Sequence, residues 1–444
     1  MSRGTNPAMR ARAFAVLGLA FLLLAGGRHA DLVARRGADN LQFVAPEDTT
    51  PLVAMTTVAF GAFRGLVADV LWVRAAELQE NGQYFELVQL ATWISQLEPT
   101  IPEVWEFQAW NLAYNISVLF PDPEDRWRWV SHGLDLLRND GLRNNPVSPV
   151  LHWNIGWLFQ HKIGMDFDQA HRFFKAELAR EAEAAFSHPD GLREVERVFR
   201  MNPESVEQLE EAFGPLDWRL PATHSLYWAD RGLRFVRGNA FQARNLQRMR
   251  LHSLSQLLLQ GEMLTDSGGA PLLALPRFDL TDRLLDELDR LDADPMFGEL
   301  SRRSMRMVLM EAVLLHAEYG RSARALELYE RLARLDVDLL PGPGGLLNLL
   351  AQSPLHEDPE QLSRDQALLR LTAMLVQARE WDGLDADRAR GYRGMARQFH
   401  RRFQAARVSA EHMDRTGLPD FEVMDRAVQT RLPAGIPFQD LETL

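Results

Sequence analysis

The chain has 444 residues, of which 46% are hydrophobic and 25% are charged, and its formal net charge is −12. This length is sufficient for a large buried core or for several domains. An acidic protein repels nucleic-acid phosphates over most of its surface, so we expect no nucleic-acid partner. The chain contains no cysteine, which excludes disulfides, thiolate metal sites and cysteine nucleophiles.

Residues 1–30 contain an apolar run from Ala13 to Gly27 that is bracketed by arginines. As a helix this run spans roughly 22 Å, less than the roughly 30 Å hydrocarbon layer of a bilayer. Two interpretations stay open: a cleaved signal peptide, or an uncleaved anchor whose flanking arginines reach the membrane interface. A buried helix of the body is a weaker third. The first two predict a cell-envelope protein, periplasmic or anchored in the inner membrane, of open topology.

Residues 31–50 mix Arg, Asp, Gly and Pro without periodicity, which is typical of a linker. The apolar stretch from Leu52 to Val73 contains Arg64 and Asp69, so we interpret it as a first core helix and not as a membrane span. From residue 58 to residue 410, apolar residues recur at helical spacing, and no sustained alternation of strand type accompanies them. The sequence therefore predicts an all-α fold.

Several helix starts are marked by a side chain suited to capping, followed in most cases by proline. They are Thr100 with Glu103, Asp122-Pro123, Ser148-Pro149, Asn202-Pro203 and Asp358-Pro359. Irregular inserts over 267–271 and 341–345 interrupt the helical pattern, and we interpret the second as a connecting loop. We divide the body into helical regions at 51–200, at 201–340, which contains inserts, and at 341–444.

Ala75 and Ala109 lie 34 residues apart, each in the middle of a predicted helix where only a small side chain lets a partner helix approach. The turn at 81–83 and the break at Glu98-Pro99 follow in the order of a tetratricopeptide repeat. The chain resembles this family over about 66–186, and again over 299–336. The resemblance implies antiparallel helix pairs stacked as an α-solenoid, since no single helix of this kind buries its apolar face alone.

In tetratricopeptide repeats the ligand-facing ridge lies on the first helix of each pair, and the resemblance implies that Ala75, Ala109 and Gly156 are its packing residues. The ridge would then carry the candidate partner-binding residues Trp72, Glu106, Trp110, Tyr114, Trp153 and Trp157. Aromatic side chains beside acidic groups suit the capture of a peptide or a partner helix. The alternative is that these tryptophans lie in the packed core, as we expect for Trp127 and Trp129.

Residues 388–410 predict a basic amphipathic helix, because an apolar stripe is flanked by arginines with no acid between Arg388 and Arg407. The candidate surface residues are Arg390, Arg393, Arg397 and Arg401. Such a helix can meet an anionic lipid surface or an acidic partner. The alternative is docking within the chain against acidic segments such as 286–294.

Signatures of catalysis are lacking in the sequence. The twelve histidines form no HExxH pair, and His152 and His161 are nine residues apart on one predicted helix, which is poor geometry for a shared metal. No lysine follows the glycines at 342–345, so a phosphate cradle is not indicated there. We expect no catalytic residue, no cofactor, no metal and no small-molecule substrate.

The sequence thus predicts a membrane-tethered or exported scaffold that binds unidentified protein partners in a cell-envelope assembly. Two other functions stay open. An envelope enzyme would need a pocket built from residues distant in the sequence, with buried acids or histidines of perturbed pKa. A peripheral membrane protein would act through the helix at 388–410.

Overall fold

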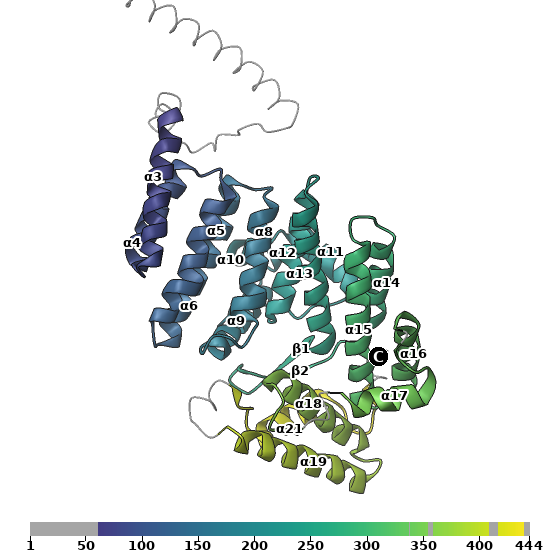
Figure 1. The fold of residues 1–444 in the computed structure, drawn as a ribbon. Helices are drawn as coiled ribbons and strands as arrows, with labels where there is room; N and C mark the ends of the chain where they lie inside the picture. Colours follow the sequence, from purple (N-terminus) through teal and green to yellow (C-terminus); the bar gives the residue numbers. More distant parts are fainter. Residues whose placement is uncertain (1–60, 337, 354–357, 408–415, 439–444) are drawn as a thin grey trace, which may run out of the picture. The chain divides into compact units, whose positions relative to one another are not determined.

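A computed structural model describes residues 61–336, 338–353, 358–407 and 416–438, and nearly all of their regular structure is helical (Figure 1). The prediction of an all-α fold class is confirmed for the described residues. The predicted signal or anchor at 1–30 and the linker at 31–50 lie outside the described residues. The described residues from Gly65 onward form one compact unit.

The first part of the described chain is a succession of helices joined by short turns. They are α3 (Gly61–Glu80), α4 (Tyr84–Leu97), α5 (Pro102–Trp110), α6 (Pro123–Asp135), α7 (Leu142–Asn144), α8 (Pro149–Trp157), α9 (His171–Phe186), α10 (Leu192–Phe199), α11 (Pro203–Phe213), α12 (Pro221–Phe235) and α13 (Ala240–Leu259). Wider π-helical turns continue three of these helices: η1 (Asn111–Ile116) after α5, η3 (Leu136–Gly141) after α6 and η4 (Leu158–Ile163) after α8. A short 3-10 turn, η2 (Ser117–Leu119), follows η1.

The second part begins with a short β-hairpin and then returns to helices. The hairpin consists of β1 (Glu262–Thr265) and β2 (Pro271–Leu275). The helices are α14 (Leu280–Asp292), α15 (Gly298–Glu318), α16 (Ser322–Leu335), α17 (Gly342–Ala351), α18 (Arg364–Trp381), α19 (Ala386–Ala405) and α21 (Phe421–Arg431).

Three of the predicted helix starts are confirmed by side-chain caps. Asp122 accepts a hydrogen bond from the main chain at the start of α6, and Ser148 does so at the start of α8, from the N–H of Leu151 at 3.4 Å. Asn202 caps α11 through the N–H of Ser205 at 3.0 Å. In each case proline takes the first helical position, where its missing N–H costs no hydrogen bond.

The two remaining predicted starts are wrong. Helix α5 begins at Pro102, so Ile101 occupies the capping position and makes no side-chain cap, and Thr100 and Glu103 form no capping box. No helix begins at Asp358-Pro359, because the capping box lies further on, at Ser363, which starts α18. Both errors arise because capping side chains are common and only the residue at the actual boundary can reach the free N–H groups.

The small residues that the resemblance placed at helix contacts are all buried: Ala75, Ala109 and Gly156. A Cβ added to Gly133 of α6 would lie 3.0 Å from the carbonyl oxygen of Ala109 in α5, so these helices approach at backbone distance. Gly156 fits against Trp228 and Met249, which belong to α12 and α13. Helix contacts of this kind leave no room for larger side chains.

Replacing Gly133 by leucine is expected to lower the free energy of unfolding by about 1–3 kcal/mol, because the side chain must push α5 and α6 apart. Denaturant titration of the whole chain measures this. Gly391→Leu in α19 is the matched control, since nothing lies within 4 Å of its added Cβ. There the gain in helix propensity of about 1 kcal/mol or less is expected to stabilise the chain. Equal effects of the two substitutions would contradict the close approach.

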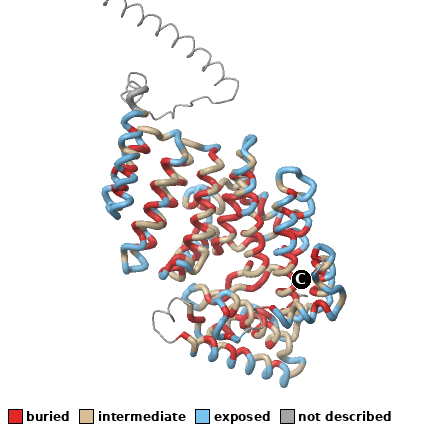
Figure 2. Tube along the Cα trace, viewed as in Figure 1, coloured by how far each residue is buried: buried red, intermediate tan, exposed pale blue. Residues whose placement is uncertain are grey.

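Successive helices of the compact unit pack side by side. Helix α5 contacts α6 and α8, α8 contacts α12, and α12 contacts α13, after which the contacts continue through α14, α15 and α16. Helix α18 pairs with α19 and also contacts α21 and β2. Buried residues gather along the seams between these helices, and exposed residues occupy their outer sides (Figure 2). Helices thus bury apolar residues both against the next helix in sequence, as α12 does against α13, and against more distant ones, as α8 does against α12.

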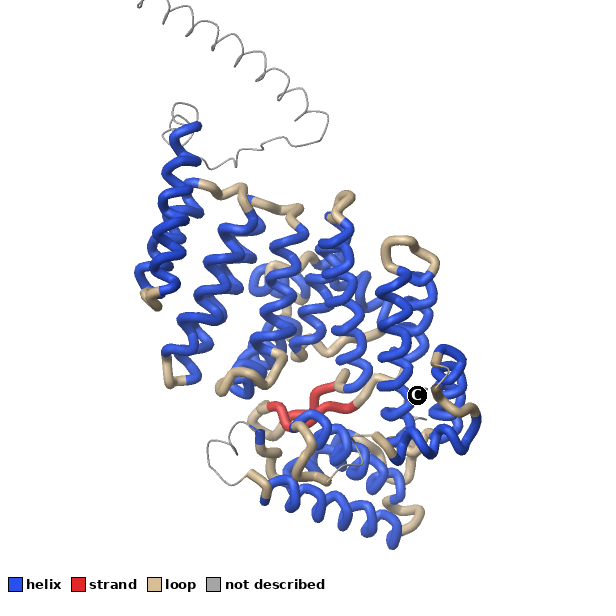
Figure 3. The backbone as a smooth tube through the Cα atoms, in the orientation of Figure 1, coloured by secondary structure: helices blue, strands red, loops and turns tan. Residues whose placement is uncertain are grey.

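The β-hairpin was not predicted, and it occupies the insert at 267–271 and its flanks (Figure 3). Its strands are antiparallel, with Met263 opposite Ala274 and Leu264 opposite Leu273. Asp266 organises the turn by accepting hydrogen bonds from the N–H groups of Gly268 and Ala270. The strands are too short to show the alternation from which a strand is predicted.

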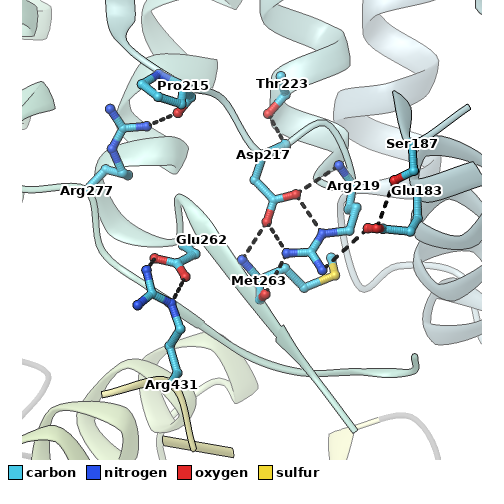
Figure 4. A network of polar contacts seen from close by, with 10 residues as sticks. All are labelled: Glu183, Ser187, Pro215, Asp217, Arg219, Thr223, Glu262, Met263, Arg277 and Arg431. Carbon is cyan, nitrogen blue, oxygen red and sulfur yellow. Dashed lines mark hydrogen bonds and ion pairs between the residues drawn. The ribbon is translucent and has the colours of Figure 1, made fainter. Parts of the chain in front are cut away.

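The outer edge of β1 is closed by two side chains from the segment before α12 (Figure 4). The N–H of Met263 donates to Asp217 Oδ2 at 2.8 Å, and its carbonyl oxygen accepts from Arg219 Nη2 at 2.9 Å. Asp217 and Arg219 are themselves paired at 2.8 Å. Glu262, the first residue of β1, is bound by Arg431 of α21. The hairpin is therefore fixed between two distant parts of the chain.

The prediction of a connecting loop at 341–345 is also wrong, because α17 begins at Gly342. A Cβ added to Gly345 would lie only 1.7 Å from the carbonyl oxygen of Leu340. The same carbonyl oxygen accepts a hydrogen bond from the Tyr329 hydroxyl at 2.6 Å. Glycine at 345 therefore allows the first turn of α17 to pack closely against the Leu340 carbonyl and against α16.

Candidate functional site

Five aromatic side chains form a continuous series of ring contacts along α5–η1 and α8–η4. This aromatic ladder consists of Trp110, Tyr114, His161, Trp157 and Trp153. The Trp110 and Tyr114 rings stack with centroids 4.1 Å apart, and the Tyr114 hydroxyl lies 3.0 Å from His161 Nδ1. His161 stacks on Trp157 at 4.7 Å, and Trp157 stacks on Trp153 at 5.3 Å. The ladder therefore joins two neighbouring helices.

The spacing of these residues explains why the rings meet. Trp110 and Tyr114 are four residues apart, as are Trp153, Trp157 and His161, so each set follows one face of its helix. Tyr114 lies in η1 and His161 in η4, the wider turns of the two helices. Such turns are rare, and they occur frequently at functional sites.

The ladder lies at the surface of the protein. Trp110 is 44% exposed, and the other four members are half-buried. In contrast, Trp127 is buried, as we expected, whereas Trp129 is only half-buried. Trp110 therefore lies outside the packed core, whereas Trp153 and Trp157 lie at its edge. Rings that are already held in contact with one another lose little side-chain entropy when they bind a partner.

Two of the predicted partner-binding residues do not join the ladder. Trp72 of α3 packs edge-on against Phe107 of α5, with ring centroids 5.0 Å apart. Glu106 is half-buried, and burial raises the pKa of its carboxyl group, although a hydrogen bond with Asn154 opposes the shift. Glu106 therefore links α5 to α8 beside the ladder.

The ladder is electrically neutral at its centre, but a buried cation lies next to it. Burial and the neighbouring Lys162 lower the pKa of His161, so its imidazole is neutral at pH 7. Burial also raises the pKa of Tyr114. The Lys162 ammonium lies 5.1 Å from the centroid of the Tyr114 ring, within the range of a cation–π interaction.

A buried charge cluster fixes Lys162 below the ladder. Asp168 Oδ2 accepts from Lys162 Nζ at 2.7 Å, and Asp168 Oδ1 accepts from Arg126 Nη1 at 2.9 Å. Burial tends to raise the pKa of Asp168, but the hydrogen bonds and charges of Lys162 and Arg126 outweigh it and hold that pKa below its usual range. The cluster ties α6 and η4 to the segment before α9.

A cleft of about 780 Å³ lies beyond the end of the ladder. Phe167, which is 73% exposed, contacts His161 with ring centroids 5.2 Å apart and also lines the cleft. The cleft is bounded by α9, the start of α12, the end of α13, the hairpin and the start of α18. Its volume is that of a ligand pocket, and most of its lining is apolar.

The cleft contains charged side chains on α9 and α18. Lys175 Nζ donates to Asp166 Oδ1 at 2.7 Å, and His171 Nδ1 lies 2.9 Å from the same oxygen. Although burial tends to raise the pKa of Asp166, these two partners hold it well below its usual value. Arg172 and Arg364 both donate to the carbonyl oxygen of Gly417.

The sequence analysis missed the cleft, although one signal was present. The chain has 49 lysines and arginines, and only Lys162 and Lys175 are lysines. Both lie beside the 163–171 turn, one below the ladder and one in the cleft. A compact ammonium group can bind a buried carboxylate where a planar guanidinium does not fit. The two lysines of an arginine-rich chain therefore lie close to this region.

The predicted basic helix is present as α19, and it docks within the chain. Ala389, Ala396, Phe399 and Phe403 are buried, and α19 packs on α18. Arg390 pairs with Asp387, Arg393 with Asp382 and Asp425, and Arg397 with Glu422. The predicted acidic segment 286–294 is not its partner, because Glu287, Asp289 and Asp292 bind Arg250, Arg331 and Arg302. Arg401 is exposed.

Within the described ranges, no group of three or more histidine and carboxylate side chains is arranged to hold a metal ion. The same part of the chain includes no helix whose length and apolar character suffice to span a bilayer. No protein-family model, curated protein or solved structure matches this chain.

Proposed function

We propose that this protein is a non-enzymatic scaffold that binds a protein partner along the aromatic ladder. The observation that carries the proposal is a set of five aromatic rings in contact on two adjacent helices, of which Trp110 is exposed and the others are half-buried. Trp and Tyr are the residues that most often dominate binding energy at protein interfaces. Rings that are already stacked bind with less loss of side-chain freedom than isolated ones.

The ladder suits a partner helix or an extended peptide with apolar anchor residues. It presents ring faces and edges, and the polar groups of Tyr114 and His161 lie among them. Lys162 is too deeply buried to meet the partner directly, so its charge acts through the Tyr114 ring. An interface of this type has an apolar centre and polar groups that fix orientation.

The scaffold is proposed to be a tetratricopeptide-like α-solenoid. Its support is the contact of successive helices and the small residues at those contacts, such as Ala109 against Gly133. Stacked helix pairs offer a wide surface by their geometry, and protein binding is the common use of such surfaces. Residues 1–30 would export the protein or tether it to the inner membrane, as part of a cell-envelope assembly.

The proposal predicts a partner whose retention depends on the ladder. The full chain is immobilised and exposed to detergent-solubilised extract of its source cells, and retained proteins are identified by mass spectrometry. The double variant Trp110→Ala, Trp157→Ala is expected to lose at least one protein that the unchanged chain retains, with apparent affinity reduced about tenfold or more, because two ring anchors are removed.

Trp93→Ala provides the matched control. Trp93 is 52% exposed on α4 and belongs to no ladder contact. This variant is expected to retain the same partner as the unchanged chain. Equal thermal stability of the three proteins ensures that the loss reflects the surface. If the double variant retains every protein that Trp93→Ala retains, the ladder is not the binding surface.

A further inference from the structure

Strand β2 forms part of the wall of the cleft. Leu272, Leu273 and Ala274 of this strand line the cleft, and helices α9 and α18 both contact the strand. The volume of the cleft is about 780 Å³, within the roughly 300–1,000 Å³ of ligand sites. A strand of the one sheet among the described residues therefore borders an apolar hollow.

The main-chain groups of β2 alternate in direction, and those of Ala274 point away from β1. Ala274 lies opposite Met263 in the antiparallel pair. The N–H and the carbonyl oxygen of Met263 are turned away from β2, because they bind Asp217 and Arg219. In an antiparallel sheet both residues of such a pair direct their main-chain groups outward. The N–H and the carbonyl oxygen of Ala274 therefore lie on the other edge of the hairpin, that of β2.

This edge of β2 is open. Among the described residues, no hydrogen bond involves the N–H or the carbonyl oxygen of Ala274, and the residue is half-buried. Proline at 271 and at 276 is typical of an edge strand, since proline cannot donate to a neighbouring strand. An unpaired donor and acceptor in a partly buried position gain free energy from a ligand that supplies a partner for both.

The chemistry of this edge favours an extended peptide as the ligand. One residue of an extended chain offers an acceptor and a donor at the spacing that Ala274 requires, as in any antiparallel pair. A helix does not offer them, because its N–H and carbonyl groups bond to each other. A purely apolar molecule would fill the cleft but leave both groups of Ala274 without a partner.

The rest of the cleft suits the side chains of such a peptide. Alternate side chains of a strand share one face. Phe173 of α9, Leu368 of α18 and Pro419 also line the cleft, so apolar side chains of an added strand gain free energy by packing against them. Two hydrogen bonds contribute modestly in water, and this burial therefore supplies much of the affinity.

The strand that would receive the peptide is held in place before any ligand enters. Asp217 and Arg219 fix Met263 of β1, and Arg431 of α21 binds Glu262 at the start of the same strand. Both contacts leave the edge of β2 free. A preformed site binds without the entropic cost of ordering its walls.

We propose that the cleft binds an extended peptide segment of a partner protein, which pairs with Ala274 as a third strand of the sheet. The apolar side chains of the peptide pack against Phe173, Leu368 and Pro419. This inference does not rest on the partner-binding role of the ladder, because none of the five ladder residues lines the cleft.

The first test selects peptides that need the cleft. A phage-displayed library of random decapeptides is depleted on the variant Ala176→Trp and then selected on the unchanged full chain. Ala176 lines the cleft on α9, so tryptophan at this position fills the cleft. The recovered peptides are expected to carry apolar residues at alternate positions. Failure to recover any peptide would overturn the site.

Ala184→Trp is the matched control for this selection. Ala184 is exposed on the same helix and does not line the cleft. The recovered peptides are expected to bind this variant as they bind the unchanged chain. Peptides that lose binding to both tryptophan variants would show a general effect on α9 and would contradict the site.

Strand pairing is tested at Ala274 with fluorescently labelled copies of the recovered peptides, whose affinity is measured by fluorescence anisotropy. Ala274→Pro removes the outward N–H and leaves the hydrogen bonds between β1 and β2 in place, so affinity is expected to fall about tenfold or more. Ala274→Ser keeps the N–H and is expected to bind like the unchanged chain. Equal affinity for the two variants would overturn strand pairing.

A further measurement uses only the unchanged chain and is independent of how any variant folds. The recovered peptide is N-methylated at one main-chain nitrogen at a time. Methylation of the nitrogen that donates to Ala274 is expected to weaken binding about tenfold or more, because the acceptor loses its partner. Methylation of the two adjacent nitrogens, which point away from β2, is expected to have little effect. A scan without one such sensitive nitrogen would overturn the pairing.

The ladder variant Trp110→Ala, Trp157→Ala separates this proposal from the partner-binding role of the ladder. It is expected to keep its affinity for the recovered peptides, because neither tryptophan lines the cleft. A failure of the ladder proposal therefore leaves these peptides bound. Loss of the peptides from the ladder variant would contradict binding in the cleft.

Discussion

At pH 5 the free energy of unfolding is expected to lie several kcal/mol below its value at pH 7, because three buried histidines cannot take up a proton in the folded chain. Burial lowers the pKa of His152 to about 4, and it lowers the pKa of His224 and of His316 to about 3. In the unfolded chain each has a pKa of about 6.5. The unfolded state therefore binds more protons below pH 6.5, and stability falls as the pH falls from there.

The expected slope follows from linkage. Each histidine contributes up to about 1.4 kcal/mol per pH unit between its unfolded and folded pKa values, so the three together contribute up to about 4 kcal/mol per unit. Carboxyl groups have pKa values near 4 in the unfolded chain, so those whose pKa is lowered on folding contribute little above pH 5. Burial raises the pKa of Glu106, Glu181 and Glu311, and proton uptake by these groups in the folded chain opposes the slope of the histidines. Urea titrations at intervals between pH 7 and pH 5 measure the slope. A flat profile over this range would show that these imidazoles are accessible to protons.

His224→Gln isolates one of the three contributions. The His224 ring donates to the carbonyl oxygen of Trp218 at 2.7 Å, and a glutamine amide offers the same donor without a titrating group. The slope is expected to fall by about 1.4 kcal/mol per pH unit. His188→Gln is the control, because it removes an exposed histidine in place of a buried one.

Asp168→Asn is expected to lower the free energy of unfolding by about 3–5 kcal/mol. The carboxylate binds Lys162 and Arg126, and all three residues are buried. The substitution leaves two cations in the interior without their shared counter-charge, which costs far more than the pair contributes in water. Denaturant titration at pH 7 measures the loss.

Asp125→Asn is the matched substitution in the same part of the chain. Asp125 pairs with Arg128 at 2.6 Å on the exposed side of α6, where solvent screens the interaction. Its loss is expected to cost less than about 1 kcal/mol. Similar losses for the two variants would mean that Lys162 and Arg126 reach water when Asp168 is neutral, contrary to their burial.

The features that could be predicted from the sequence are those set by neighbouring residues. The caps at Asp122, Ser148 and Asn202 involve partners two or three residues away, so the local pattern determines them. The burial of Ala75 and Ala109 follows from the helical spacing of apolar residues in the same way. Four of the five ladder residues, Trp110, Tyr114, Trp153 and Trp157, belong to the set that the repeat resemblance implied.

The features that could not be predicted depend on distant segments. Met263 is fixed by Asp217, 46 residues earlier in the chain, and no local alternation indicates that a strand forms there. Trp72 has the same residue type and helical setting as Trp110, but Phe107 covers it from the next helix pair. The cleft joins residues from Gln160 to Pro419, so only the three-dimensional arrangement reveals it.

The pairing of Asp217 and Arg219 with Met263 has a consequence for the behaviour of the protein at high concentration. A strand with unpaired main-chain groups at its edge can pair with the same strand of another molecule, and such pairing initiates ordered aggregation. Here the Asp217 carboxylate accepts from the N–H of Met263, the second residue of β1, and the Arg219 guanidinium donates to its carbonyl oxygen. These two side chains hinder the addition of a strand from another molecule at this edge of β1. The one sheet among the described residues is therefore protected there against self-association.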